Sequence, residues 1–230
     1  MKKIVLIFIL LFGLSCMNKN KAEKTIKLIQ QQENFIALLD MVWQTEQTPI
    51  RLRDSLMRIY GTESKQYNKQ QKIYEINHIA NEKIVTTILD KYGWPSIEMI
   101  GEHGNWTICN VIQHSDNDVR IKYLPMMRQA VKENKLEPRY LVRAVDRIAT
   151  EAGNLQVYGG QMKYDPENKS FNVGPVYDPA NIDKRRAEIG LGPIAEFLKN
   201  RFDFEWNLKE QIKRTAEFEM EKAEIIKMEE

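Results

Sequence analysis

The densest run of side chains capable of chemistry is the segment over residues 106–118, WTICNVIQHSDND. Helical spacing gathers Gln113 and His114 on the side opposite its apolar residues. Because imidazole titrates near neutral pH, His114 is a candidate general base or ligand contact, with Asp116 as a carboxylate that orients it. The alternative is a structural histidine that is hydrogen-bonded at the end of a helix.

Asp146 and Arg147 form a second candidate pair. They lie in a segment whose opposite side is apolar, so both side chains can approach a groove from one helix. In this interpretation Asp146 is the other carboxylate that can orient His114, and Arg147 stabilises negative charge. An ion pair on the surface of a helix is the competing interpretation.

Residues 156–161, QVYGGQ, combine two adjacent glycines with candidate ligand contacts at Tyr158 and Gln161. Glycines permit a bulge or a close approach of the backbone to a ligand, whereas the competing interpretation is a kinked edge strand. Farther along, Arg185 and Arg186 lie near the start of an expected helix. Arginines at this place either grip an anion through planar, bidentate hydrogen bonds or pin the preceding hairpin to the helices.

Several signatures of known chemistry are missing from the sequence. It contains no GxxxxGK[ST] phosphate loop, no HExxH, no GxSxG, no paired CxxC and no GxGxxG. The three histidines, His78, His103 and His114, have no spacing that would bring them together as zinc ligands. We therefore expect neither a metal centre nor a cofactor.

The elements that must position these side chains are mostly helical. The apolar stripe over residues 64–92 is the clearest helix, and it ends at Gly93 and Pro95. Before it, residues 22–44 form an amphipathic pattern, and Thr48 followed by Pro49 predicts the N-cap and first position of a second helix, which ends at Gly61. Further helices are expected over residues 106–114, 119–133, 138–152, 181–189 and 193–200.

The period of the pattern changes over residues 155–177. The stretches 155–164 and 170–177 are rich in Val, Tyr and Phe and flank a turn-forming segment, so they predict a β-hairpin. With 43% hydrophobic and 29% charged residues, the 230-residue chain has enough apolar side chains for one sizeable core. We therefore predict a mainly α (α+β) fold: a single multi-helix globular domain over residues 25–200 with one β-hairpin, followed by a charged C-terminal helix over residues 201–230.

The first sixteen residues, MKKIVLIFILLFGLSC, have the layout of a secretory signal. Two lysines precede an apolar run over residues 4–12, which is too short to span a bilayer because a spanning helix takes about 20 apolar residues. Cys16 directly after this run resembles the lipobox of bacterial lipoproteins, although Gly13 occupies the place of the usual leucine. The expectation is a signal peptide over residues 1–15, lipidation of Cys16 and a polar tether over residues 16–24, with an ordinary cleaved signal or an uncleaved anchor as the alternatives.

Removing residues 1–15 takes away Lys2 and Lys3 and lowers the formal net charge from +2 to zero. A chain without net positive charge is not typical of nucleic-acid binding, so we expect no nucleic-acid partner. With Cys16 lipidated, Cys109 is the only remaining thiol, which excludes an intramolecular disulfide. Its apolar surroundings in the sequence favour a buried, inert thiol over a nucleophile.

The same segments resemble a family of bacterial proteins catalogued as domain of unknown function number 6624. The resemblance covers about residues 35–200, and it rests on GWP at 93–95, QHSD at 113–116, DR at 146–147, QVYGGQ at 156–161 and IDKRRAEIGL at 182–191. It names no reaction, and Gly160 stands where the family pattern has threonine, so a hydroxyl role does not carry over to that position. It implies one site made of His114, Asp116, Asp146, Arg147, Gln161 and the arginines after the hairpin.

Two classes of function fit these residues. The first is a binding module at the cell envelope, anchored by its lipid and facing the periplasm or the cell surface. It would hold a polar or anionic small ligand, or a partner protein, through the residues Gln113, Arg147, Tyr158, Gln161, Arg185 and Arg186. The second is a hydrolase in which His114, oriented by Asp116 or Asp146, activates water while an arginine stabilises the developing negative charge.

Overall fold

The computed structural model describes residues 33–165 and 170–229. The expected signal peptide, Cys16 and the tether lie outside these residues. The described chain forms two compact units: the first comprises residues up to Lys83 together with Pro95–Ile108, and the second comprises Ile84–Trp94 and the chain from Cys109 onward. The two units are described one after the other.

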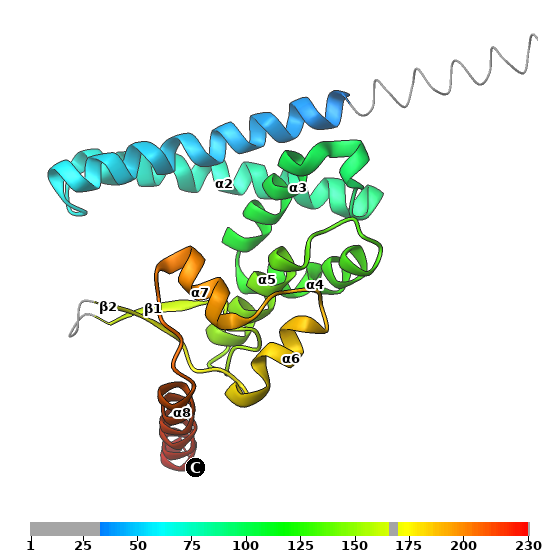
Figure 1. Cartoon of the computed structure of the whole chain (residues 1–230). Helices are drawn as coiled ribbons and strands as arrows, with labels where there is room; N and C mark the ends of the chain where they lie inside the picture. Colours follow the sequence, from blue (N-terminus) through cyan, green and yellow to red (C-terminus); the bar gives the residue numbers. More distant parts are fainter. Residues whose placement is uncertain (1–32, 166–169, 230) are drawn as a thin grey trace, which may run out of the picture. The chain divides into compact units, whose positions relative to one another are not determined.

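The first unit is built on a long helical hairpin. A continuous helix over residues 33–60 ends at Gly61, whose φ of 80° is favourable for glycine, and the chain returns in α2 (Lys65–Tyr92). The two helices run side by side in opposite directions, as Figure 1 shows in blue and cyan. The expectation of separate helices with Thr48 as an N-cap was wrong, because the helix runs through this residue without a break.

The reason that Pro49 is tolerated inside this helix is visible in its neighbours. A proline has no amide hydrogen, so the carbonyl of Thr45, four residues earlier, loses its usual helical partner. Asn77 of α2 replaces that partner, because its Nδ2 donates to the Thr45 carbonyl over 2.9 Å. A tertiary hydrogen bond thus compensates for the proline, and the local start signal is overridden.

The next helix, α3 (Ile97–His114), contains a break that the sequence pattern did not locate. Gly101 has φ 68° and ψ 170°, which is not helical, so the chain changes direction between two helical segments. The second of these segments includes the predicted helix over residues 106–114, which is confirmed. In the first unit, the buried apolar residues of this region include Leu39, Val42 and Ile100.

The second unit begins with a pair of packed helices, α4 (Asn117–Lys132) and α5 (Pro138–Glu151). Pro138 occupies the first turn of α5, where its missing amide hydrogen costs nothing. The predicted hairpin follows as β1 (Met162–Asp165) and β2 (Ser170–Val173), paired antiparallel with Met162 opposite Val173. Both strands are shorter than expected, because residues 155–161 form a loop that α5 holds in place.

The chain then continues through short helices around a small core. These are η1 (Pro179–Asn181), α6 (Ile182–Ala187) and α7 (Ile194–Phe202). Their core cluster consists of Val173, Val176, Ile182, Ile194 and Leu198. The charged C-terminal helix is α8 (Leu208–Glu229), and it attaches to the end of the hairpin through Gln211 and Thr215, whose side chains bond the backbone of Gly174 and Val176.

The fold class is therefore mainly α with a single two-stranded hairpin, as the sequence predicted. Among the helices of residues 33–165 and 170–229, none combines the length and apolar character needed to cross a bilayer.

Candidate functional site

The Asp146 carboxylate organises the loop over residues 156–161. The residue is completely buried in α5, and its Oδ1 accepts the amides of Val157 and Tyr158 at 2.7 and 2.9 Å. Its Oδ2 accepts the amide of Gly160 at 2.7 Å. Burial raises the pKa of this carboxyl group, while the three amide hydrogen bonds oppose that shift. These amides are the only hydrogen-bond partners of Asp146 among the described residues, so Asp146 does not orient His114.

Gln156 closes the same loop from inside. Its side chain is completely buried, with Nε2 donating to the carbonyls of Gln161 and Gly174 at 3.1 and 2.9 Å. Its Oε1 accepts the Gln161 amide at 2.9 Å. A Cβ atom on Gly174 would lie 2.9 Å from the Gln156 amide nitrogen, which explains the glycine at that position. The half-buried side chain of Gln161 is not needed for this closure.

The two arginines after the hairpin direct their donors at backbone carbonyls. Arg186 is buried and donates to the carbonyls of Tyr158 and Gly192 at 2.9 and 2.8 Å. Arg185 donates to the carbonyls of Val157 and Asp178 at 3.2 and 3.0 Å, and also to that of Tyr177. This geometry agrees with the second of the two roles considered for these arginines, in which they hold the preceding segment against the helices. Their role as ligand contacts, like that of Tyr158, stays a prediction.

The corner between α3 and α4 brings other predicted residues together. The backbone carbonyl of Gln113 accepts from Arg147 at 2.6 Å and from Arg120 at 3.1 Å, and the Gln113 side chain donates to the Tyr140 carbonyl at 3.3 Å. Arg120 also pairs with the Glu151 carboxylate. His114 is the last residue of α3, and Asp116 occupies the N-cap position of α4 without a capping hydrogen bond from its side chain. Both residues are exposed.

A row of arginines lies on α5, and the sequence pattern pointed only to its last member, Arg147. Arg139, Arg143 and Arg147 recur every fourth residue and therefore lie along one face of the helix. Arg139 pairs with Glu137 over 2.9 Å. Among the described residues, the half-buried Arg143 has neither a hydrogen bond nor an ion pair. The four-residue spacing is the signal in the sequence that would have identified this row.

The electrostatic surroundings of Arg143 are unfavourable for its charge. Burial is the main cause that lowers the pKa of its guanidinium group, and repulsion from Arg201 of α7 is the second. Arg201 is exposed, stacks on the ring of Phe202 at 5.3 Å and pairs with no carboxylate in the described chain. Among the described residues, no carboxylate pairs with either guanidinium group.

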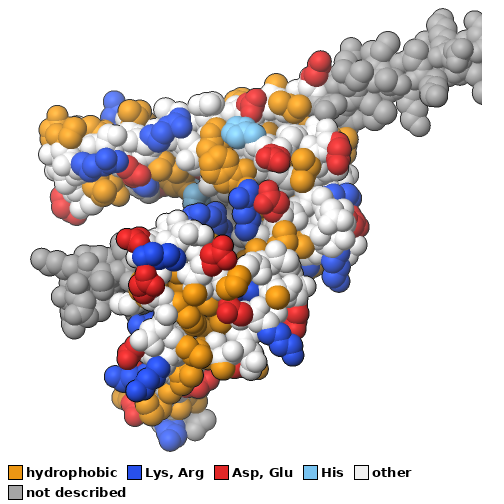
Figure 2. Space-filling view, viewed as in Figure 1, with side chains coloured by type: hydrophobic (Ala, Val, Ile, Leu, Met, Phe, Trp, Pro, Cys, Tyr) orange, Lys and Arg blue, Asp and Glu red, His pale blue; other side chains and the backbone are white. Residues whose placement is uncertain are grey.

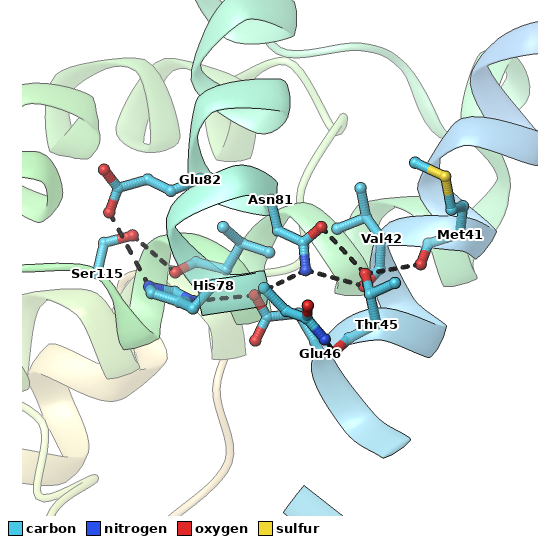
Figure 3. Close-up of polar contacts among 10 residues, drawn as sticks. Met41, Val42, Thr45, Glu46, His78, Asn81, Glu82 and Ser115 are labelled. Carbon is cyan, nitrogen blue, oxygen red and sulfur yellow. Dashed lines mark hydrogen bonds and ion pairs between the residues drawn. The ribbon is translucent and has the colours of Figure 1, made fainter. Parts of the chain in front are cut away.

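The first unit contains a buried polar cluster that the sequence did not predict (Figure 3). Glu46 is completely buried, and its Oε1 lies 2.9 Å from His78 Nδ1 and 3.2 Å from Asn81 Nδ2. Thr45 donates its hydroxyl to Asn81 Oδ1 at 3.0 Å. Glu46 Oε2 and His78 Nε2 are buried without a hydrogen-bond partner among the described residues, and Glu82 Oε2 lies 3.9 Å from that histidine nitrogen.

None of these groups of side chains forms a metal centre. Within the part of the chain that the structure describes, no group of three or more His, Cys, Asp or Glu side chains could hold a metal ion.

The fold and these networks define a mainly helical protein in which one helix, α5, holds a loop with its buried carboxylate and carries a row of arginines. The chain belongs to the Family of unknown function (DUF6624), whose model matches residues 55–209, well over half of its length. Searches of curated proteins and of solved structures gave no significant match.

Proposed function

We propose that this protein is a binding module that holds an anionic ligand, such as a carboxylate or phosphate compound, on the arginine row of α5. The observation that carries the proposal is the half-buried guanidinium of Arg143, which lacks a partner in the described chain and is repelled by Arg201. An uncompensated charge that is partly removed from water is unfavourable in the free protein. A bound anion would remove this penalty.

The neighbouring residues support the same class of ligand. Arg147 lies one turn along the helix face from Arg143. Its Nη1 donates a hydrogen bond to the Gln113 carbonyl, and this bond fixes the position of the Arg147 guanidinium group. Guanidinium groups recognise carboxylate and phosphate oxygens through paired, planar hydrogen bonds. Arg143, Arg147 and Arg201 are the residues to which we assign ligand contact. Arg185 and Arg186 then support the loop rather than the ligand.

The hydrolase alternative has less support from the geometry. The carboxylate of Asp146 bonds three amides, so Asp116 is the remaining acid of the two that were considered for orienting His114. We also propose that the module works at the cell envelope, attached through a lipid on Cys16, because the first sixteen residues have the layout of a lipoprotein signal.

The test is thermal unfolding of the Cys16→Ser chain with inorganic phosphate and with citrate, against sodium chloride at matched ionic strength. A ligand that binds only the folded state raises the midpoint in a concentration-dependent way. We expect this increase in the parent chain and its loss in Arg143→Ala and Arg147→Ala. Arg139→Ala is the matched control, because that arginine lies on the same face but already pairs with Glu137.

A second measurement separates a binding role from a structural one. Without any ligand, Arg143→Met should raise the free energy of unfolding by about 1 kcal/mol, because it replaces an unpaired, partly buried charge with an apolar side chain of similar length. A structural arginine would destabilise the protein when replaced. The proposal is wrong if Arg143→Ala responds to both anions like the parent chain, or if neither anion stabilises the parent.

A further inference from the structure

Two pairs of side chains meet on the surface of the first unit. Asp40 and Trp43 are three residues apart on the helix over residues 33–60, and His103 and Trp106 are three residues apart on α3. Because residues at this spacing share a helix face, each helix presents one polar and one aromatic side chain to the other. The matched spacing sets acid beside imidazole and indole beside indole.

The contacts within this group are close. His103 Nδ1 lies 3.0 Å from Asp40 Oδ1. The ring centroids of Trp43 and Trp106 are 4.2 Å apart at an interplanar angle of 41°, and the His103 ring meets Trp43 edge to face at 5.2 Å. We call these four residues the Trp106 patch. The carboxylate fixes the orientation of the imidazole ring, and the two indoles fix one another.

Two glycines of α3 create this approach. Gly101 breaks the helix with a φ of 68°, so the following segment takes a new direction. Gly104 then lies against the first helix: a Cβ atom there would be 3.0 Å from Leu39 Cδ1 and 2.9 Å from Ile100 Cβ. A side chain at residue 104 would therefore crowd Ile100 and Leu39, so glycine favours the close approach of the two helices at this point.

The patch remains open to solvent. Trp106 is 39% exposed, whereas Trp43 is only 9% exposed, so the patch offers one open indole backed by a second. The side chains of Asp40 and His103 are 56% and 46% exposed. Figure 2 shows a histidine side chain next to hydrophobic side chains on the face of the molecule that it draws. An open aromatic face therefore lies next to a fixed pair of hydrogen-bonding groups.

We propose that the Trp106 patch is a binding site for a neutral saccharide. The face of an indole ring carries partial negative charge and attracts the slightly positive C–H groups on one face of a sugar ring. Sugar hydroxyls both donate and accept hydrogen bonds, and the Asp40 carboxylate and the outer nitrogen of His103 provide partners of this kind. The same ligand chemistry comes from a free oligosaccharide or from a chain end of a polymer.

Other ligand classes fit the patch less well. An anion would be repelled by Asp40, and a quaternary ammonium group needs several open aromatic faces, whereas Trp43 is largely covered. The inference does not depend on the anion site, because the four residues belong to the other unit. Asp40 and Trp43 also precede the region matched by the family model, which starts at residue 55.

The test is ligand-observed saturation-transfer NMR on the Cys16→Ser chain with cellotetraose, chitotetraose and maltotetraose. This measurement uses sugar protons as the reporter, so it works equally in variants that lack a tryptophan. We expect saturable transfer to at least one of these oligosaccharides, with a dissociation constant of about 1 mM or lower. Trp106→Ala should weaken binding about tenfold or more, Trp106→Phe less, and His103→Ala measurably.

Trp206→Phe is the control, since that tryptophan packs against the core cluster of the second unit and should leave binding unchanged. Circular dichroism of each variant checks that the helices are retained. His103→Ala changes an exposed side chain, so it tests the site without disturbing the core. The proposal is overturned if no oligosaccharide shows saturable transfer at about 10 mM, ten times the expected dissociation constant, or if Trp106→Ala binds like the parent. It is equally overturned if a photo-crosslinking residue at position 106 captures a protein while saccharides show no transfer.

Discussion

At the scale of single residues, the buried side chain of Asp146 fixes the conformation of the backbone over residues 156–161. Its two oxygens accept three amides from one loop, so the loop needs no regular secondary structure to satisfy its buried N–H groups. The arginines of α6 satisfy carbonyls of the same loop from the other side. The polar residues that look catalytic in the sequence therefore include several whose partners are backbone atoms.

Replacing Asp146 with asparagine tests this role. The amide group of asparagine would place an N–H donor against one of the three backbone donors, so we expect a loss of about 2 to 3 kcal/mol in the free energy of unfolding. Chemical denaturation of parent and variant measures it. Asp183→Asn is a useful comparison, because Asp183 accepts one backbone amide in the described part of the chain, that of Ile194 at 2.7 Å. Equal losses in the two variants would contradict the special importance of Asp146.

Cys109 provides a second test at this scale. The thiol is buried, and burial is the main cause that raises its pKa well above the ordinary value. A raised pKa keeps the protonated thiol to higher pH than in a free cysteine, so the reactive thiolate stays scarce at pH 8. In the Cys16→Ser chain we expect iodoacetamide to modify Cys109 only after denaturant is added. Mass spectrometry measures the extent of alkylation. Rapid alkylation of the native protein would refute the interpretation of Cys109 as a buried, inert thiol.

At the scale of elements, the hairpin of the first unit depends on polar contacts between its two helices. Pro49 leaves the Thr45 carbonyl without a helical donor, and Asn77 provides one from α2. We expect Asn77→Ala to lower the free energy of unfolding by about 1 to 2 kcal/mol, because it leaves that carbonyl unpaired. The double variant Asn77→Ala with Pro49→Ala should recover much of this loss, since alanine restores the helical amide. Purely additive effects in the double-mutant cycle would contradict the coupling.

The contact between the buried Glu46 and the half-buried His78 joins the same two helices. Without His78, the buried Glu46 carboxylate keeps only the Asn81 amide as a partner within residues 33–165 and 170–229. Removing the partner of a buried carboxylate is strongly destabilising, so His78→Ala should lower the free energy of unfolding by about 3 kcal/mol. Glu82→Ala is the control, because Glu82 Oε2 is 3.9 Å from the imidazole and its side chain is partly exposed. Thermal unfolding that shows the two variants to be equally stable would refute this account.

At the scale of the whole molecule, the expected anchor governs where both proposed sites operate. If Cys16 carries the lipid, the mature protein should fractionate with membranes in the producing bacterium, because several acyl chains hold a protein firmly. Cys16→Ser should release it or leave it unprocessed. The measurement is membrane fractionation together with the mass of the amino-terminal peptide. Unchanged attachment and an unchanged mass in the variant would remove the basis for placing the protein at the envelope.

The sequence by itself determined the mainly helical class, the position of the hairpin and the family. These depend on local signals: the helical pattern of α2 extends over 28 residues, and the segment that precedes β2 in the sequence has a turn-forming composition. Such features need no knowledge of distant neighbours.

Only the tertiary structure decided where the helices break and what the polar side chains bond. The helix through Pro49 continues because Asn77, 32 residues from the freed carbonyl, supplies the missing donor. The pairing of Asp40 with His103 spans 63 residues and depends on a glycine contact that no local pattern encodes. Hydrogen bonds between side chains act over about 3 Å, so their partners are fixed only when distant segments have been packed together. For this reason the sequence named candidate polar residues but could not reveal which partners they bond.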